Sequence, residues 1–285
     1  MKTYNGLCIE ARNALREYGA ENPNLEARSL VALAAGKTLD ELIRDYMLYA
    51  SDDIEHEVLS LVDRRIAGEP LAYILGSWEF YGLDMVVTSD VLVPRIDTEV
   101  LVDEALSRIP DKTAELRVLD LCCGSGCIGC ALGVHLPKAK LVLADLSTPA
   151  LHVARANVMK HNLGVRTSCV QANALSLPLE NLGQFDMILS NPPYITPEEI
   201  GTLDPSVRDF EPMMALDGGE DGYMFYRSII RKWRRLLKKG GWLLFEVGEG
   251  QAEYVKEHMR RAGFSHVTAI KDTGCTERVV AGQLY

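Results

Sequence analysis

Hydrophobic positions recur at helical spacing through the first quarter of the chain. Apolar residues at helical spacing form two stripes, which are Leu7, Ala11, Ala14 and Leu15 and, further on, Leu25, Leu30, Leu33 and Ala34. Pro23 suits the first turn of a helix, and Gly36 suits the end of the same helix. The polar run Ser51-Asp52-Asp53 precedes a third apolar stripe that ends near Ile66. The pattern predicts a small helical domain over residues 1–75.

The pattern changes between residues 76 and 93. Aromatic and β-branched residues, which favour strands, gather here as Phe80, Tyr81, Val86, Val87 and Val91. Gly82 lies among them where a tight turn would fall. We expect a β-hairpin that links two domains.

Beyond residue 94 the chain alternates between helical and strand patterns. A helix is expected near residues 98–108. Apolar strand patterns follow at residues 116–121, 140–145, 165–170, 185–190, 242–247, 266–270 and 278–281. Strands separated by helical segments predict an α/β fold, a doubly wound parallel sheet of seven strands with helices on both faces. Residues 94–285 are therefore predicted to form one larger domain.

The first of these strands leads into a glycine-rich segment, residues 120–129. Glycines let the main chain approach a ligand closely and leave the next helix start facing it. Asp145 ends the second strand, at the distance expected for an acid that accepts both ribose hydroxyls. An adenosine-containing cofactor is indicated. Gly124-x-Gly126-x-x-Gly129 also fits the dinucleotide fingerprint, so NAD remains a rival, although it leaves Asp120 and a later motif unexplained.

That later motif is Asn191-Pro192-Pro193-Tyr194, directly after the buried strand pattern at residues 185–190. The Asn191 side-chain oxygen and a main-chain carbonyl can accept the two N–H groups of a planar amide or aromatic amine. Prolines make such a loop rigid and supply no competing donors. Tyr194 would pack its ring against the flat substrate group. The alternative is a rigid turn that merely ends the strand.

The composition of the chain narrows the range of possible substrates. The chain has 285 residues, a formal charge of −10 and a sequence pI near 5.2, which disfavours a broad nucleic-acid surface. The basic run at residues 231–239 is interpreted as a solvated helix face before Gly240-Gly241. The first residues lack a signal-peptide pattern and no apolar run is long enough to span a membrane, so a cytoplasmic location is expected.

The seven cysteines are expected to be free thiols in a reducing compartment. Cys123-x3-Cys127-x2-Cys130 also has the spacing of an iron–sulfur site. We favour the interpretation that these cysteines are small, partly apolar side chains packed beneath the nucleotide loop, and we expect no metal.

Together these motifs resemble the peptide chain release factor glutamine methyltransferases, over nearly the full chain. The matching segments are Gly-Glu-Pro-Leu-Ala-Tyr-Ile-Leu-Gly at 68–76, Phe-Tyr-Gly-Leu at 80–83, Val-Pro-Arg-Ile-Asp-Thr-Glu at 93–99, Asn-Pro-Pro-Tyr-Ile at 191–195, and Glu211-Pro212, Ala215-Leu216, Gly218-Gly219, Asp221-Gly222 and Tyr226-Arg227. The resemblance implies a class I S-adenosylmethionine-dependent methyltransferase whose helical domain helps to bind the release factor.

The resemblance also implies roles for residues. Those that would bind S-adenosylmethionine are Cys122, Cys123, Gly124, Ser125, Gly126, Asp145, Asn173, Ala174 and Asn191. The glutamine of a release factor's Gly-Gly-Gln loop would be held by Asn191, Pro192, Pro193 and Tyr194, with Asn191, the Pro192 carbonyl and Tyr194 as the catalytic set. No direct nucleic-acid binding is expected.

This chain departs from the family at several positions. Cys122 stands where relatives usually have Gly, and a cysteine suits the loop only if its φ is negative. Asn173 stands where relatives usually have Asp. Ala174 replaces a large side chain, and Ile96-Asp97 replaces Pro-Glu. Two alternatives remain open: a methyltransferase for adenine N6 or guanine N2, and a catalytically silent module that binds a release factor or the ribosome.

Overall fold

A computed structural model describes all 285 residues, which divide into two compact units. The first unit comprises residues 1–77 together with residues 204–210. The second comprises residues 78–203 and 211–285. None of the helices combines the length and the apolar character that crossing a lipid bilayer would require.

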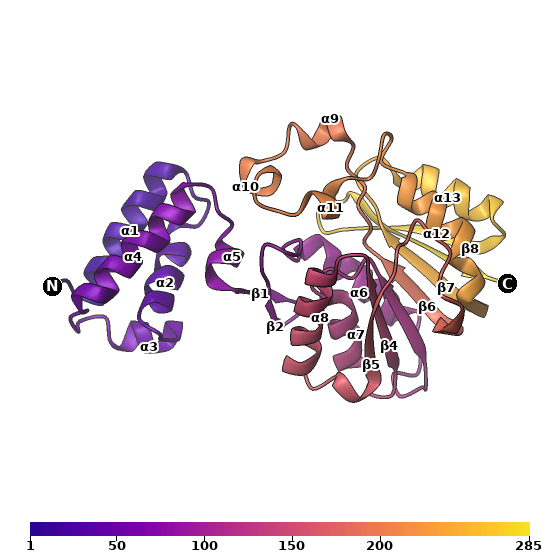
Figure 1. Ribbon diagram of the computed structural model, residues 1–285, viewed down its shortest axis with the longest axis horizontal. Coiled ribbons are helices and arrows are strands. Elements are labelled where there is room, and N and C mark those ends of the chain that lie inside the picture. The colour runs from indigo at the N-terminus through magenta and orange to yellow at the C-terminus, as the bar shows by residue number, and fades with distance from the viewer. The chain divides into compact units, whose positions relative to one another are not determined.

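The first unit is helical, and Figure 1 shows α1 to α5 in indigo and violet and α10 in orange. Its helices are α1 (Tyr4–Tyr18), α2 (Pro23–Ala34), α3 (Leu39–Arg44), α4 (Asp52–Ile66), α5 (Leu71–Leu75) and α10 (Pro205–Arg208). Pro23 opens α2, and the Ser51 hydroxyl accepts a hydrogen bond from the Ile54 main chain to cap α4. One core forms around Leu15, Leu30 and Leu42, which are fully buried. Leu25 and Leu33 of the second predicted stripe are exposed instead, so that part of the prediction is wrong.

The second unit is built on a seven-stranded sheet. Its strands are β3 (Arg117–Leu121), β4 (Lys140–Asp145), β5 (Thr167–Gln171), β6 (Phe185–Ser190), β7 (Leu237–Glu246), β8 (Phe264–Lys271) and β9 (Glu277–Leu284). They lie in the order β5-β4-β3-β6-β7-β9-β8. The predicted hairpin is present as β1 (Ser77–Phe80) and β2 (Leu83–Val86). The doubly wound α/β fold expected from the sequence is confirmed.

The sheet is mixed, however, whereas the sequence predicted a parallel one. Strands β3 to β7 pair in parallel, but β9 runs antiparallel to both β7 and β8. The turn between β8 and β9 is tight: the Asp272 main-chain N–H donates to the Thr276 carbonyl at 2.9 Å. So short a connection can join only antiparallel strands.

Helices cover both faces of the sheet (Figure 1). The helices of this unit are α6 (Glu99–Ser107), α7 (Cys127–His135), α8 (Thr148–Lys160), α9 (Pro197–Ile200), α11 (Met213–Leu216), α12 (Met224–Lys232) and α13 (Ala252–Arg261). Helices α6, α7 and α8 share one core with the sheet, and α12 and α13 share the other. Short 3-10 turns lie at Ile96–Thr98, Gly164–Arg166, Glu180–Leu182 and Arg234–Leu236.

The basic run at residues 231–239 is not a single helix face, which corrects the sequence interpretation. Helix α12 ends at Lys232, and β7 already begins at Leu237. Gly240 and Gly241 lie in a bulge of β7, where the register against β6 shifts. Lys238 pairs there with Asp186, at 2.8 Å between Nζ and Oδ2.

Candidate active site

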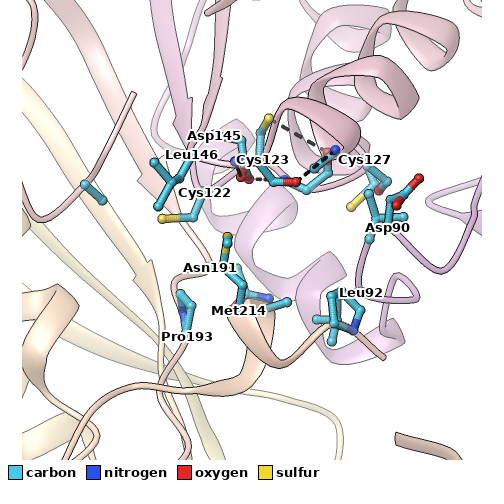
Figure 2. Close-up of a pocket in the computed structure, with 18 of the residues that line it drawn as sticks. Asp90, Leu92, Cys122, Cys123, Cys127, Asp145, Leu146, Asn191, Pro193 and Met214 are labelled. Carbon is cyan, nitrogen blue, oxygen red and sulfur yellow. Dashed lines mark hydrogen bonds between the residues drawn. The ribbon is translucent and has the colours of Figure 1, made fainter. Parts of the chain in front are cut away.

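A cavity of about 290 Å³ opens at the carboxyl ends of β3, β4 and β6, within the second unit. Of the residues predicted from the sequence, those that line it are Cys122, Cys123, Gly124, Ser125, Asp145, Asn173, Ala174, Asn191 and Pro193. Gly126, Pro192 and Tyr194 lie outside the lining. Figure 2 shows Asp145 and Cys123 on one side of the cavity and Asn191, Pro193 and Met214 on the other. The glycine-rich loop and the Asn-Pro-Pro-Tyr turn therefore face a common space.

The glycine-rich loop follows β3 and turns into α7 through several residues with positive φ. Gly124 has φ +51° and Gly126, which caps α7, has φ +76°. A Cβ at Gly129 would lie 2.0 Å from Leu143, so close packing of α7 on the sheet explains the third glycine.

Cys122 also has a positive φ, of +62°. The requirement for a negative φ at Cys122, stated from the sequence, is wrong. The backbone of Cys122 adopts a left-handed conformation that glycine adopts freely. Because cysteine has a Cβ, this conformation is strained. Burial and the nearby Asp145 carboxylate raise the pKa of the Cys122 thiol, so the side chain is uncharged.

Asp145 ends β4 and holds the loop from the side. Its Oδ2 accepts from the Gly124 main-chain N–H at 2.9 Å, and its Oδ1 accepts from the Ser147 N–H at 2.9 Å. Each oxygen keeps a further lone pair. The carboxylate therefore has the capacity to accept two hydroxyls of a ribose.

Asp120 lies beneath the loop and is 1% exposed. Its Oδ2 accepts from the Gly129 N–H at 2.9 Å, whereas its Oδ1 is buried without a partner. Burial raises the pKa of Asp120 to about 7, and Asp145 adds to the effect. Asp120 does not line the cavity, whereas Asp145 does, and a carboxylate there suits a ligand that carries positive charge, as S-adenosylmethionine does.

The far end of the cavity is lined by Asn173 and Ala174. Asn173 Oδ1 accepts from the Leu175 main-chain N–H at 2.8 Å, which leaves its Nδ2 as a free donor. The Ala174 carbonyl accepts from the Ser228 hydroxyl at 2.9 Å and from the Trp233 indole at 3.1 Å. This end is rigid, and Asn173 can donate to a ring nitrogen of adenine.

At the opposite end, Asn191 is held by a residue that the site prediction omitted. Asn191 Nδ2 donates to the Thr98 hydroxyl oxygen at 3.3 Å. Thr98 lines the cavity and is 3% exposed. Because Nδ2 is engaged, Asn191 Oδ1 is the atom left to accept a substrate N–H.

Tyr194 does not line the cavity, so its predicted place against the substrate has no support in the lining. Its hydroxyl donates to Glu246 Oε1 at 3.4 Å. Its main-chain carbonyl accepts from Gln251 Nε2 at 3.0 Å. Burial, followed by the charge of Glu246, raises the pKa of Tyr194, which therefore stays protonated.

Close glycine packing holds this turn. A Cβ at Gly218 would lie 2.5 Å from the Tyr194 Cα, and one at Gly222 would lie 2.6 Å from the Tyr194 carbonyl oxygen. The Gly218 N–H donates to the Ile195 carbonyl at 2.8 Å. The segment after the motif is thus built around the backbone of Tyr194.

An ion pair between the buried Glu211 and the partly exposed Arg95 fixes another wall. Glu211 Oε1 lies 2.5 Å from Arg95, and its Oε2 accepts from the Val93 N–H at 3.2 Å. Arg95 and Pro212 both line the cavity. Two segments far apart in sequence are joined here, and both belong to the motifs that carry the family resemblance.

The cysteines do not form a metal site: no group of three or more His, Cys, Asp or Glu side chains is arranged to hold a metal ion. All seven are free thiols. Cys127 and Cys130 are buried in the core beneath the loop, and burial raises the pKa of Cys127 to about 12.

Comparisons with known proteins identify the family. The chain matches the Methyltransferase small domain over residues 96–203 and the PrmC N-terminal domain over residues 7–76. A release factor glutamine methyltransferase from Geobacter sulfurreducens is 43% identical over 96% of this chain and 94% of its own length. One from Caulobacter vibrioides is 37% identical over 95% and 93%.

A solved methyltransferase from Pyrococcus furiosus shares the fold. It covers 78% of this chain and 96% of its own length, with a TM-score of 0.53 and 17% identity. At 17% identity this similarity shows only a shared fold. The assignment of the chain to a family rests on the full-length relatives. The chain belongs to the release factor glutamine methyltransferase family.

Proposed function

We propose that the protein transfers the methyl group of S-adenosylmethionine to the side-chain amide nitrogen of a glutamine, in the Gly-Gly-Gln loop of a peptide chain release factor. The observation that carries this proposal is the orientation of Asn191. Its Nδ2 is engaged by Thr98, so its Oδ1 is left as an acceptor at the cavity. The names of the full-length relatives support the protein substrate.

S-adenosylmethionine is the methyl donor that the methyltransferase family and fold require. It supplies a methyl group on a sulfonium sulfur, which leaves as a thioether. Asp145 accepts the ribose hydroxyls, and the loop from Cys122 to Gly126 encloses the methionine part. Asn173 and Ala174 bind the adenine. We assign these roles to the residues as proposals.

The chain's contribution to the reaction is positioning. An amide nitrogen is a weak nucleophile because its lone pair is delocalised. Asn191 Oδ1, at the cavity, accepts one of its hydrogens. We assign the other to the Pro192 carbonyl on the family resemblance, although Pro192 lies outside the cavity lining. Such orientation of the nitrogen can contribute ~7–11 kcal/mol. The new C–N bond forms as the S–C bond breaks, and the nitrogen then loses its proton to water.

The helical unit is proposed to bind the partner protein. We propose three parts: residues 1–75 bind the release factor, residues 76–93 form the linking hairpin, and residues 94–285 carry out methyl transfer. The family models match residues 7–76 and 96–203, and the relative from Geobacter sulfurreducens covers 96% of the chain. The protein would act in the cytoplasm, where translation ends, and the charge of −10 disfavours direct nucleic-acid binding.

Asn191→Ala tests the assignment. We expect release-factor methylation to fall below detection while binding of S-adenosylhomocysteine, measured by calorimetry, stays within about twofold. Asn181→Ala, an exposed residue in the Glu180–Leu182 turn, is the matched control. Loss of S-adenosylhomocysteine binding in Asn191→Ala, or turnover retained in that variant, would refute the assigned role.

A further inference from the structure

A buried carboxyl group stands behind the acceptor end of the cavity and has no part in the proposed chemistry. Glu246 ends β7 and is 2% exposed. Its neighbours include Thr98, which holds Asn191, and Tyr194, which ends the turn. Two members of the substrate-holding motif are thus connected to one acidic group.

We propose that Glu246 and Thr98 are positioning residues that set the orientation of the Asn191 carboxamide, with Oδ1 toward the substrate and Nδ2 away from it. The inference rests on the proposed function, because it concerns how the same amide is held.

The Thr98 hydroxyl has one proton to donate. Its oxygen already accepts the Asn191 Nδ2 hydrogen, so its own proton must go elsewhere. Glu246 is a neighbour of Thr98, whose hydroxyl lowers the pKa of the Glu246 carboxyl. Glu246 Oε2 is buried without a hydrogen-bond partner, so it is an open acceptor for that proton.

An ionised Glu246 can only accept hydrogen bonds. Its Oε1 accepts from the Tyr194 hydroxyl at 3.4 Å, and its Oε2 is buried with no partner in full hydrogen-bond geometry. The carboxylate therefore draws the protons of Tyr194 and Thr98 toward itself. With the Thr98 proton so directed, Asn191 can present only Nδ2 to Thr98.

Protonation of Glu246 removes this restriction. A carboxylic acid can donate to Thr98, whose proton is then free to point at Asn191 Oδ1. The carboxamide would turn over and present Nδ2 to the N–H groups of the substrate amide. Two donors facing each other cannot hold the amide in place.

The surroundings of Glu246 place its titration in an accessible range. Burial raises its pKa to about 7, the Thr98 hydroxyl and the positive charge of Arg278 oppose the rise, and the negative charge of Asp97 adds to it. Arg278 lies on β9 and forms ion pairs with Asp97 and Asp272, with distances from its Nη2 to their Oδ2 atoms of 3.3 and 3.2 Å. The remaining neighbours are uncharged: the Tyr194 hydroxyl, the Cys127 thiol, and Tyr226, whose hydroxyl donates to the Glu246 main-chain carbonyl.

The first experiment removes the hydroxyl of Thr98. Thr98→Val should lower kcat for release-factor methylation by about tenfold or more, with the KM for release factor and the Kd for S-adenosylhomocysteine within about twofold. Thr98→Ser keeps the hydroxyl and should retain most of the activity. Thr167→Val is the matched control, because its hydroxyl is buried on β5 without a partner. A Thr98→Val enzyme with unchanged kcat would overturn the proposal.

The second experiment does not depend on that variant folding. At saturating cofactor, the wild-type kcat should fall as the pH drops through about 7. Glu246→Gln replaces one acceptor oxygen by an NH2 group, which only donates, and it cannot ionise, so its kcat should be about tenfold lower and flat over the same range. An acid limb that persists in Glu246→Gln would refute the relay. A wild-type protein without release-factor methylation would instead refute the proposed function itself.

Discussion

Gly218 makes the closest approach to the substrate-holding turn, and a single methyl group there provides a sharp test. A Cβ at this position would lie 2.5 Å from the Tyr194 Cα and 2.6 Å from its carbonyl carbon. Both are backbone atoms, so no side-chain rotation relieves the clash. An ordinary contact requires a displacement of about 1 Å. Pro192 and Pro193 are stiff and would transmit that movement to Asn191.

Gly218→Ala should therefore lower kcat by about a hundredfold, or ~2.7 kcal/mol, since a misplacement of about 1 Å is known to cost that much. The assay is initial-rate transfer of labelled methyl to purified release factor, with S-adenosylhomocysteine binding measured in parallel. Binding should stay within about threefold, because Gly218 does not line the cavity.

Gly274→Ala is the matched control. Gly274 lies in the β8–β9 turn, where a Cβ would meet only the Asp272 carboxylate oxygen, at 3.3 Å. Its activity should equal that of the wild type. If Gly218→Ala kept kcat within about threefold while remaining folded, the close packing around Tyr194 would not control the reaction.

Three further outcomes follow from strained or buried groups at the cofactor end. Cys122→Gly should be more stable to denaturant than Cys122→Ala by ~0.5–1 kcal/mol, because only glycine relieves the positive φ; equal stabilities would contradict the strain. Asn173→Asp exchanges the Nδ2 donor to an adenine ring nitrogen for a charged acceptor. A carboxylate accepts from both Leu175 and the adenine amine, so S-adenosylhomocysteine binding should tighten about threefold or more by calorimetry; weaker binding would refute the contact with the amine. Folding raises the pKa of Asp120 from 3.8 to about 7, so the unliganded protein should lose stability as the pH rises from about 4 to about 7. In denaturant melts, Asp120→Asn should lessen that loss. An unchanged dependence of the unfolding free energy on pH would contradict the raised pKa.

Much of the fold could be predicted because hydrophobic periodicity records burial. The strands at residues 140–145 and 185–190 were predicted with the bounds that β4 and β6 have. The reversal of β9 could not be predicted that way, because an apolar strand pattern is the same in either direction. The short turn at Asp272 carried the signal for a hairpin.

The site prediction included the loop and Asp145 because motifs place those residues at fixed spacing. Thr98 and Glu246 were missed because their roles come from contacts between segments far apart in sequence. Each had a signal: Thr98 lies in the Val93–Glu99 motif, and Glu246 is an acid at the end of an apolar strand. A charged residue in such a strand calls for a buried partner.

The central claim is that Asn191 holds a protein glutamine for methyl transfer. The most direct test incubates the protein with labelled S-adenosylmethionine and purified release factor, with total RNA and DNA in parallel reactions, and maps the label by mass spectrometry. We expect one added methyl group on the side-chain amide nitrogen of the glutamine in the Gly-Gly-Gln loop, absent with Asn191→Ala. Label on nucleic acid, or on any other release-factor residue, would contradict the account.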